Sequence, residues 1–151
     1  IGSADRMNYT ALGSTVNIAS RIEGLNKYFG TTVLISEAVR AEAGPGIISR
    51  PAGLVVVKGA VAPILVHALM GTQGVDATTD LNPAALAKAE AWRAPFEAYQ
   101  AGMWATAVEE LERYQAKHGP DSLAQATLAR ARSWLAAPPA QWDGIEHMTE
   151  K

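Results

Sequence analysis

Asn17 and Arg21 are the two polar residues whose types and spacing most readily suggest binding chemistry. They lie four positions apart in "STVNIASRIEGLNKYFG", so on a helix both side chains project from one face and can reach one ligand. An asparagine amide donates and accepts hydrogen bonds, and the planar, permanently charged guanidinium of arginine can bind two oxygens of a phosphoryl group. The pair therefore suggests an anion clamp, although the spacing also fits a solvated helix face along which Arg21 extends its aliphatic stem.

A helix predicted over residues 14–29 must position this pair. Its apolar residues recur at helical spacing and form one buried stripe, which consists of Ile18, Ile22, Leu25 and Phe29. The polar pair lies beside this stripe, at the edge of the expected core. Ser14 or Thr15 can cap the first turn, and Gly30 can end the helix in the left-handed conformation that glycine adopts readily.

Around this helix the sequence predicts short strands and one further helix. β-branched and apolar runs predict four strands, over 7–12, 31–36, 54–59 and 63–71. The last two can pair as a hairpin, and a short helix is predicted over 37–43, closed by "GPG". The order β-α-β-α-β-β indicates an α+β fold, a sheet with helices on one face.

The texture of the chain changes after this region. We predict four segments, a half-domain over 1–71, a linker over 72–81, an all-α helical extension over 82–137 and a tail over 138–151. The linker is rich in Gly, Thr and Asp, and strand signals vanish beyond it. The tail has a turn at Asp143-Gly144.

The extension is predicted to hold three helices. Asn82 and Pro83 suit the start of the first, which Pro95 must kink or split. The third can be capped by Asp121 or Ser122. Aromatic residues at helical spacing mostly fill cores. We therefore interpret the four tryptophans as core residues, namely Trp92, Trp104, Trp134 and Trp142.

Composition excludes several classes of function. The 151 residues carry a net charge of −2, so no nucleic-acid partner is predicted from bulk electrostatics. With no cysteine, disulfides and thiolate metal sites are excluded. His67, His118 and His147 are too scattered to form a ligand set. No apolar run is long enough to span a bilayer.

Two segments resemble a known family. "GSADRMNYTALGSTVNIASRIEGLNKYFGTTVLISEAV", followed by "LVVVKGAVAPILVHALMG", is similar to the C-terminal half of a class III nucleotide cyclase catalytic domain. Its strand, glycine turn and V-N-x-A-x-R helix follow one another at the same spacing as in that family. The resemblance covers residues 1–71 and implies a partial ferredoxin-like sheet-and-helix half-domain.

The resemblance implies a role in ATP binding for four residues. Asn17 corresponds to the asparagine that orients the ribose, and Arg21 to the arginine that stabilises phosphoryl charge in the transition state. Thr10, seven positions before Asn17, corresponds to the residue that reads the adenine amino group in adenylate cyclases. Lys58 corresponds to a lysine that reaches the triphosphate. Thr10 also fits an ordinary strand threonine, and Lys58 an exposed charge at a strand end.

The implied reaction is ring closure of ATP to 3′,5′-cyclic AMP with loss of pyrophosphate, at a site formed between two subunits. It implies two Mg²⁺ or Mn²⁺ ions, whose aspartate ligands belong to the preceding half of the domain, so no metal ligand is predicted in this chain. Ser14 stands where the family often has aspartate, and the later Asp and Glu residues are expected on helix surfaces. The chain alone is expected to be inactive and to pair with a second copy or with the missing half.

Resemblances in the extension are more local. "FEAYQAGMWATAVEELERY" is similar to a tetratricopeptide helix pair, with Gly102 near its turn. "LAAPPAQWDGIEHMTEK" is similar to the C-terminus of bacterial cyclases that carry an extracellular sensor and membrane helices. We therefore expect the cytoplasmic portion of an inner-membrane protein, with an upstream part removed, since the sequence does not begin with Met. An alternative stays open: a non-catalytic scaffold that dimerises through the cyclase-like part and binds a protein partner through its helices.

Overall fold

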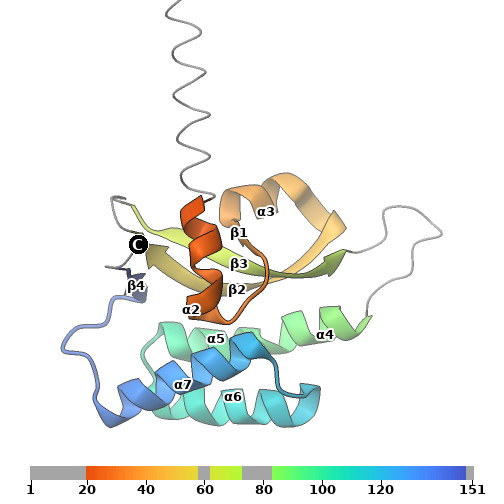
Figure 1. Cartoon of the computed structure of the whole chain (residues 1–151). Coiled ribbons are helices and arrows are strands. Elements are labelled where there is room, and N and C mark those ends of the chain that lie inside the picture. The colour runs from red at the N-terminus through yellow and green to blue at the C-terminus, as the bar shows by residue number, and fades with distance from the viewer. Residues whose placement is uncertain (1–19, 58–61, 73–82, 149–151) are drawn as a thin grey trace, which may run out of the picture.

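A computed structural model of the chain describes residues 20–57, 62–72 and 83–148 (Figure 1). The strand predicted over 7–12 and the start of the helix predicted over 14–29 lie outside these residues. So does the linker predicted over 72–81, apart from Thr72, which ends a strand.

The helix that carries Arg21 is confirmed in its described part. Residues 20–24 are helical, and α2 (Asn26–Phe29) continues the helical run after a turn at Leu25. It ends at Gly30, whose φ of 72° lies in the left-handed region, as predicted. The buried side of this run is the predicted apolar stripe, represented by Ile22, Leu25 and Phe29. The stripe therefore holds the helix against the core.

Among the described residues, the sheet has four strands, in the order β1-β3-β2-β4. Their bounds are β1 Leu34–Ser36, β2 Ile47–Val56, β3 Ile64–Thr72 and β4 Ile145–His147. β3 pairs antiparallel with both β1 and β2, so the predicted hairpin is confirmed, and β4 pairs parallel with β2. Between β1 and β2 the chain forms α3 (Glu37–Ala43), with the predicted bounds, and the 3-10 turn η1 (Gly44–Gly46).

Two strand predictions were wrong. β2 begins at Ile47 rather than at Leu54, and it passes through Pro51, where proline cannot donate to a strand ladder. A register shift between Pro51 and Gly53 accommodates it. In addition, β4 lies in the tail, where no strand was predicted.

Within residues 83–148 the chain forms four helices. They are α4 Pro83–Ala91, α5 Arg93–Gln100, α6 Trp104–His118 and α7 Ser122–Ala136. The predicted split near Pro95 is confirmed, since α4 ends before Trp92 and Pro95 lies in the first turn of α5. Asp121 caps α7, with its side chain accepting from the backbone N–H of Ala124, as predicted.

One hydrophobic core joins the sheet to the helices. Its fully buried side chains include Phe29 of α2, Val66 of β3, Leu111 of α6, and Trp92, which lies between α4 and α5. α4–α7 lie on one side of the sheet and α3 on the other (Figure 1). The expectation of helices on one face is thus corrected. None of the helices in the described ranges has the length and apolar character that crossing a bilayer requires.

Candidate functional site

Of the four residues assigned to nucleotide binding, the structure describes Arg21. Thr10, Asn17 and Lys58 lie outside the described residues, so their mutual geometry stays a prediction. Arg21 is exposed on the helical stretch over 20–24, whereas its neighbour Ile22 is 5% exposed. The helix therefore presents Arg21 toward solvent and its apolar stripe toward the core.

The same helical run packs closely on β2, the strand that precedes Lys58 in the sequence. The ring of Phe29 lies against Gly53, where a Cβ atom would come 2.9 Å from Phe29 Cε1. Gly53 is needed here because any side chain would collide with a fully buried ring. The C-terminal end of the helical run that carries Arg21 is therefore fixed against β2.

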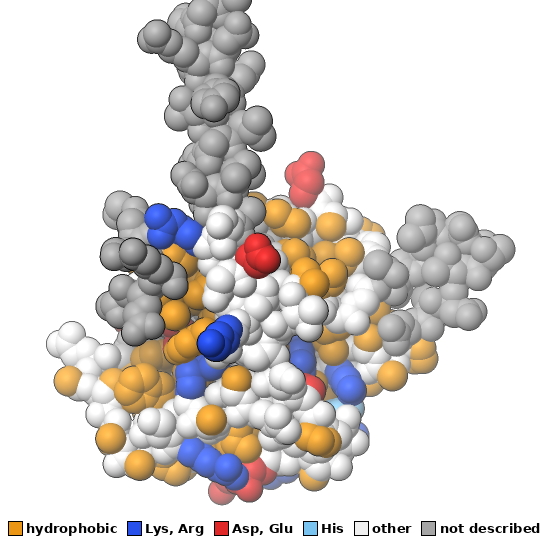
Figure 2. Space-filling model, in the orientation of Figure 1, with side chains coloured by type: hydrophobic (Ala, Val, Ile, Leu, Met, Phe, Trp, Pro, Cys, Tyr) orange, Lys and Arg blue, Asp and Glu red, His pale blue; other side chains and the backbone are white. Residues whose placement is uncertain are grey.

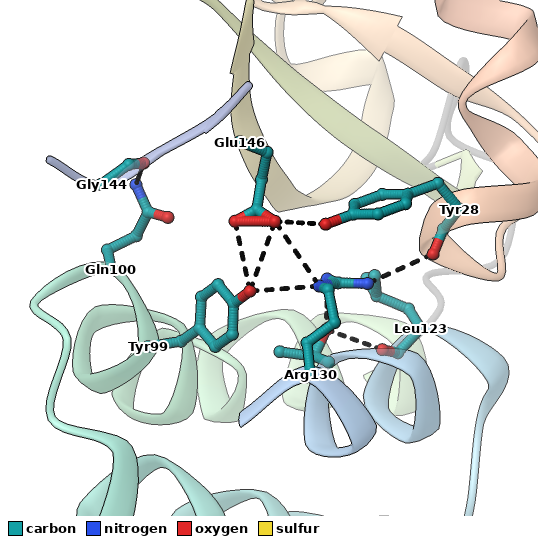
Figure 3. Close-up of polar contacts among 8 residues, drawn as sticks. Tyr28, Tyr99, Gln100, Leu123, Arg130, Gly144 and Glu146 are labelled. Carbon is teal, nitrogen blue, oxygen red and sulfur yellow. Dashed lines mark hydrogen bonds and ion pairs between the residues drawn. The ribbon is translucent and has the colours of Figure 1, made fainter. Parts of the chain in front are cut away.

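A buried polar cluster lies at this junction (Figure 3). We call it the tyrosine–glutamate cluster, and its members are Tyr28 of α2, Tyr99 of α5, Arg130 of α7 and Glu146 of β4. The Tyr28 hydroxyl donates to Glu146 Oε1. The Tyr99 hydroxyl donates to Glu146 Oε2 at 3.2 Å and accepts from Arg130 Nε at 3.1 Å. Arg130 Nε itself lies 3.8 Å from Glu146 Oε1.

Electrostatics keep the two phenols of this cluster protonated. Burial, followed by the hydrogen bond to Glu146, raises the pKa of Tyr28 well above its usual range. Burial likewise raises the pKa of Tyr99. Both hydroxyls are therefore donors at neutral pH, toward a carboxylate whose side chain is only 4% exposed. We interpret the cluster as a tie between elements, because its charged groups are already paired within it.

A second buried ion pair joins β2 to α7. Arg50 NH1 and NH2 donate to the two Asp121 oxygens at 3.1 Å and 2.8 Å, and NH1 also donates to the Tyr114 hydroxyl at 2.6 Å. A cavity of about 210 Å³ lies beside it. It is lined by Gly30, Thr31, Thr32, Val33, Arg50, Ala68, Leu69, Met70, Ser122 and Leu123. Because Asp121 meets the charge of Arg50, this cavity offers no uncompensated cation to an anionic ligand.

The histidines are separate from one another and engaged in local contacts. His67 Nε2 lies 2.7 Å from Glu37 Oε1, His147 Nε2 lies 3.0 Å from Asp143 Oδ2, and the His118 ring packs 5.1 Å from that of Tyr114. Within the described ranges, no group of three or more His, Asp or Glu side chains could hold a metal ion.

The sequence did not predict the tyrosine–glutamate cluster. The later acidic residues were expected on helix surfaces, which is wrong for Glu146, a buried strand residue. Tyr28 and Glu146 are separated by 118 positions. Only the pairing of β4 with β2 brings them together, and three-residue strands carry little periodic signal.

Comparisons with known proteins find similarity to adenylate cyclases. The chain is 40% identical over 85 residues to "Adenylate cyclase 1" of Rhizobium meliloti (strain 1021), a match covering 56% of this chain and 13% of that protein. It is 49% identical over 39 residues to "Adenylate cyclase" of Anabaena cylindrica, covering 26% of this chain and 8% of that protein. No family model matches the chain. No solved structure matches it either. In part of its length, this chain is therefore similar to bacterial adenylate cyclases, of which it spans about an eighth or less.

Proposed function

We propose that this chain contributes the base, ribose and phosphate contacts of an adenylate cyclase active site. The observation that carries the proposal is the 40% identity over 85 residues to a protein named as an adenylate cyclase. The exposure of Arg21 on a helix whose other side is buried fits a residue that must reach a ligand.

Each assigned residue has a role that its chemistry permits. The Thr10 hydroxyl accepts from the adenine amino group, and the Asn17 amide orients the ribose so that its 3′-hydroxyl faces the α-phosphorus. The Arg21 guanidinium binds phosphoryl oxygens as charge develops on them, and Lys58 binds the triphosphate. The 3′-hydroxyl loses its proton to solvent as its oxygen forms a bond to the α-phosphorus. The bond from the α-phosphorus to the oxygen that bridges to the β-phosphorus breaks, and pyrophosphate leaves with that bonding electron pair.

Two divalent cations supply nucleophile activation and charge neutralisation in such a reaction when bound. None of the four assigned residues is a metal ligand, so no step assigned to this chain passes through a metal. We therefore propose that this chain forms cyclic AMP only together with a partner that carries the metal ligands. That partner is either a second copy of the protein or a separate N-terminal half of the catalytic domain.

A chimera tests the proposal. The whole 151-residue chain would replace the matching part of the Rhizobium meliloti adenylate cyclase and the residues that follow it, because residues 1–71 share one core with the helices. Cyclic AMP formation would be measured with Mg²⁺ and with Mn²⁺. We expect an active chimera in which Arg21→Ala lowers kcat by about 100-fold, the usual effect of removing a group that binds transition-state charge.

Lys27→Ala provides the matched control, because Lys27 is an exposed cation on the same helical run. We expect the Lys27→Ala chimera to retain the parent rate. A folded chimera that makes no cyclic AMP, or equal rates for Arg21→Ala and Lys27→Ala, would contradict the proposed function. The scaffold alternative predicts that equality, and also equal ATP binding by the parent chain and its Arg21→Ala variant.

A further inference from the structure

We propose that Glu146 and Arg130 are positioning residues that hold the helix carrying Arg21 in the orientation required for nucleotide binding. The consequence for ATP rests on the proposed function, whereas the mechanical role rests on the contacts of the tyrosine–glutamate cluster. The C-terminal strand β4 would thus belong to the nucleotide site in a functional sense, although it does not carry any of the assigned ligand contacts.

The first contact fixes the helix to the tail. Tyr28 lies at the C-terminal end of the helical run, next to the fully buried Phe29, and its hydroxyl donates to Glu146 on β4. Figure 3 shows the Tyr28 side chain and the Glu146 carboxylate pointing toward each other across the gap between α2 and β4. A hydrogen bond is directional, so it fixes the rotation of the helix about its axis better than apolar contacts alone.

The second contact holds the same helical turn through α7. Arg130 NH1 donates to the backbone carbonyl of Tyr28 at 3.2 Å. Its guanidinium lies 4.7 Å from the centre of the Tyr28 ring and 5.1 Å from that of Phe29. The backbone and both aromatic rings of this turn are thus held by a single cation, which Tyr99 and Glu146 hold in turn.

The third contact makes β2 the fixed reference. Glu146 stands opposite Val55 in the parallel pairing of β4 with β2, and Met148 N–H donates to the Val56 carbonyl at 2.9 Å. A force on the Glu146 carboxylate is therefore resisted by the sheet. The helix, the tail strand and β2 form one connected unit.

The geometry carries this restraint from Tyr28 to Arg21. The two residues are seven positions apart, about two helical turns or roughly 10 Å along the axis. A rotation of the helical run about its axis moves the end of the Arg21 side chain farther than it moves the backbone, because the side chain extends farther from the axis. We therefore expect loss of the cluster to change ligand binding at Arg21 beyond its effect on stability.

Tyr28→Phe is the sharpest test, because it removes only the hydroxyl and keeps the ring that packs on Phe29 and Arg130. We would measure hydrogen–deuterium exchange of the amides over 22–29 in the 151-residue chain, and ATP affinity, from the KM with Mn²⁺, in the chimera that carries this whole chain. We expect exchange to become about tenfold faster, the ratio for one lost hydrogen bond to a charged group. We expect ATP to bind roughly three- to tenfold more weakly.

Three further variants separate positioning from stability. Leu111→Val alters a fully buried residue of α6, a helix that packs on α5 and α7, and serves as the control for a general loss of stability. At a comparable fall in melting temperature it should leave both readouts unchanged. Glu146→Leu should speed amide exchange over 22–29 and weaken ATP binding at least as much as Tyr28→Phe does. Glu146→Gln keeps an oxygen acceptor for the Tyr28 hydroxyl, so it should bind ATP more tightly than Glu146→Leu.

The possible outcomes are distinct. Unchanged exchange over 22–29 in Tyr28→Phe and Glu146→Leu would overturn the positioning role. Faster exchange with unchanged ATP affinity, in a chain that loses binding on Arg21→Ala, would also overturn it. Equal ATP binding by the parent and Arg21→Ala would overturn the proposed function, and with it the link to ATP. Faster exchange together with weaker ATP binding supports the inference.

Discussion

Arg50 and Asp121 join the middle of β2 to the first turn of α7 through two hydrogen bonds, of 3.1 Å and 2.8 Å. The side chain of Arg50 is 8% exposed and that of Asp121 is 20% exposed. Asp121 also caps α7 by accepting from Ala124 N–H at 2.8 Å. One carboxylate therefore neutralises a buried cation and satisfies a helix terminus at the same time.

Asp121→Ala should accordingly be among the most destabilising polar substitutions in this chain. It leaves the buried Arg50 without its counter-charge and α7 without its cap, and we expect the free energy of unfolding to fall by about 3 kcal/mol. Urea denaturation at pH 7 would measure the change. Glu110→Ala removes a carboxylate from an exposed pair with Arg113 and should cost less than about 1 kcal/mol. Similar losses for the two variants would contradict this account.

Gly30→Ala should be destabilising for a backbone reason and a packing reason. The φ of Gly30 is 72°, which costs a residue with a Cβ atom about 1 kcal/mol or more. That Cβ would also lie 2.6 Å from the carbonyl oxygen of Ser122. We expect a loss of about 2 kcal/mol in the free energy of unfolding. Gly24→Ala is the control, because Gly24 does not have a positive φ and an added Cβ atom would meet nothing within 4 Å, so it should cost little. A Gly30→Ala loss no larger than that of Gly24→Ala would contradict this explanation.

The sequence predicted those parts of the fold that depend on local signals. The helix that ends at Gly30 has a stripe of period 3.6 and a glycine stop, and α3 has a serine cap followed by a good helical run. The break near Pro95 and the cap at Asp121 follow from the chemistry of single residues. In each case the information lies within a few positions of the element.

The parts that could not be predicted depend on distant partners. The part of β2 before Leu54 contains Pro51 and Gly53, two residues that argue against a strand. They fit a strand here because the register shifts between them and because the Phe29 ring packs on Gly53. β4 exists because its residues pair with β2. Glu146 is buried because Tyr28, Tyr99 and Arg130 surround it, and a single carboxylate in the sequence does not reveal that environment. For the candidate site, only the exposure of Arg21 enters the described structure.

His67 should make stability depend on pH between neutral and mildly acidic conditions. Burial lowers the pKa of this imidazole below its ordinary value and outweighs the opposing effect of its hydrogen bond to Glu37. The unfolded chain therefore takes up this proton at a higher pH than the folded chain. The free energy of unfolding should fall as pH falls from about 6.5 through the folded pKa. Urea midpoints from pH 7.5 to 5 would show the slope, which His67→Gln should reduce. An equal slope in both proteins would contradict this assignment.

Trp142 should anchor the tail on the helices, because its indole both packs and donates. Its Nε1 donates to the Gln100 carbonyl at 2.9 Å, and its ring lies 5.1 Å from that of Trp104. Gly102 fits beneath it, since a Cβ there would be 2.9 Å from Trp142 Cδ1. We expect Trp142→Ala to lower the free energy of unfolding by about 3 kcal/mol, and Trp142→Phe, which loses mainly the hydrogen bond, by about 1 kcal/mol. Chemical denaturation followed by circular dichroism would compare them. Equal losses would mean that the ring contributes little beyond its N–H, and the tail would then depend on the pairing of β4 with β2 instead.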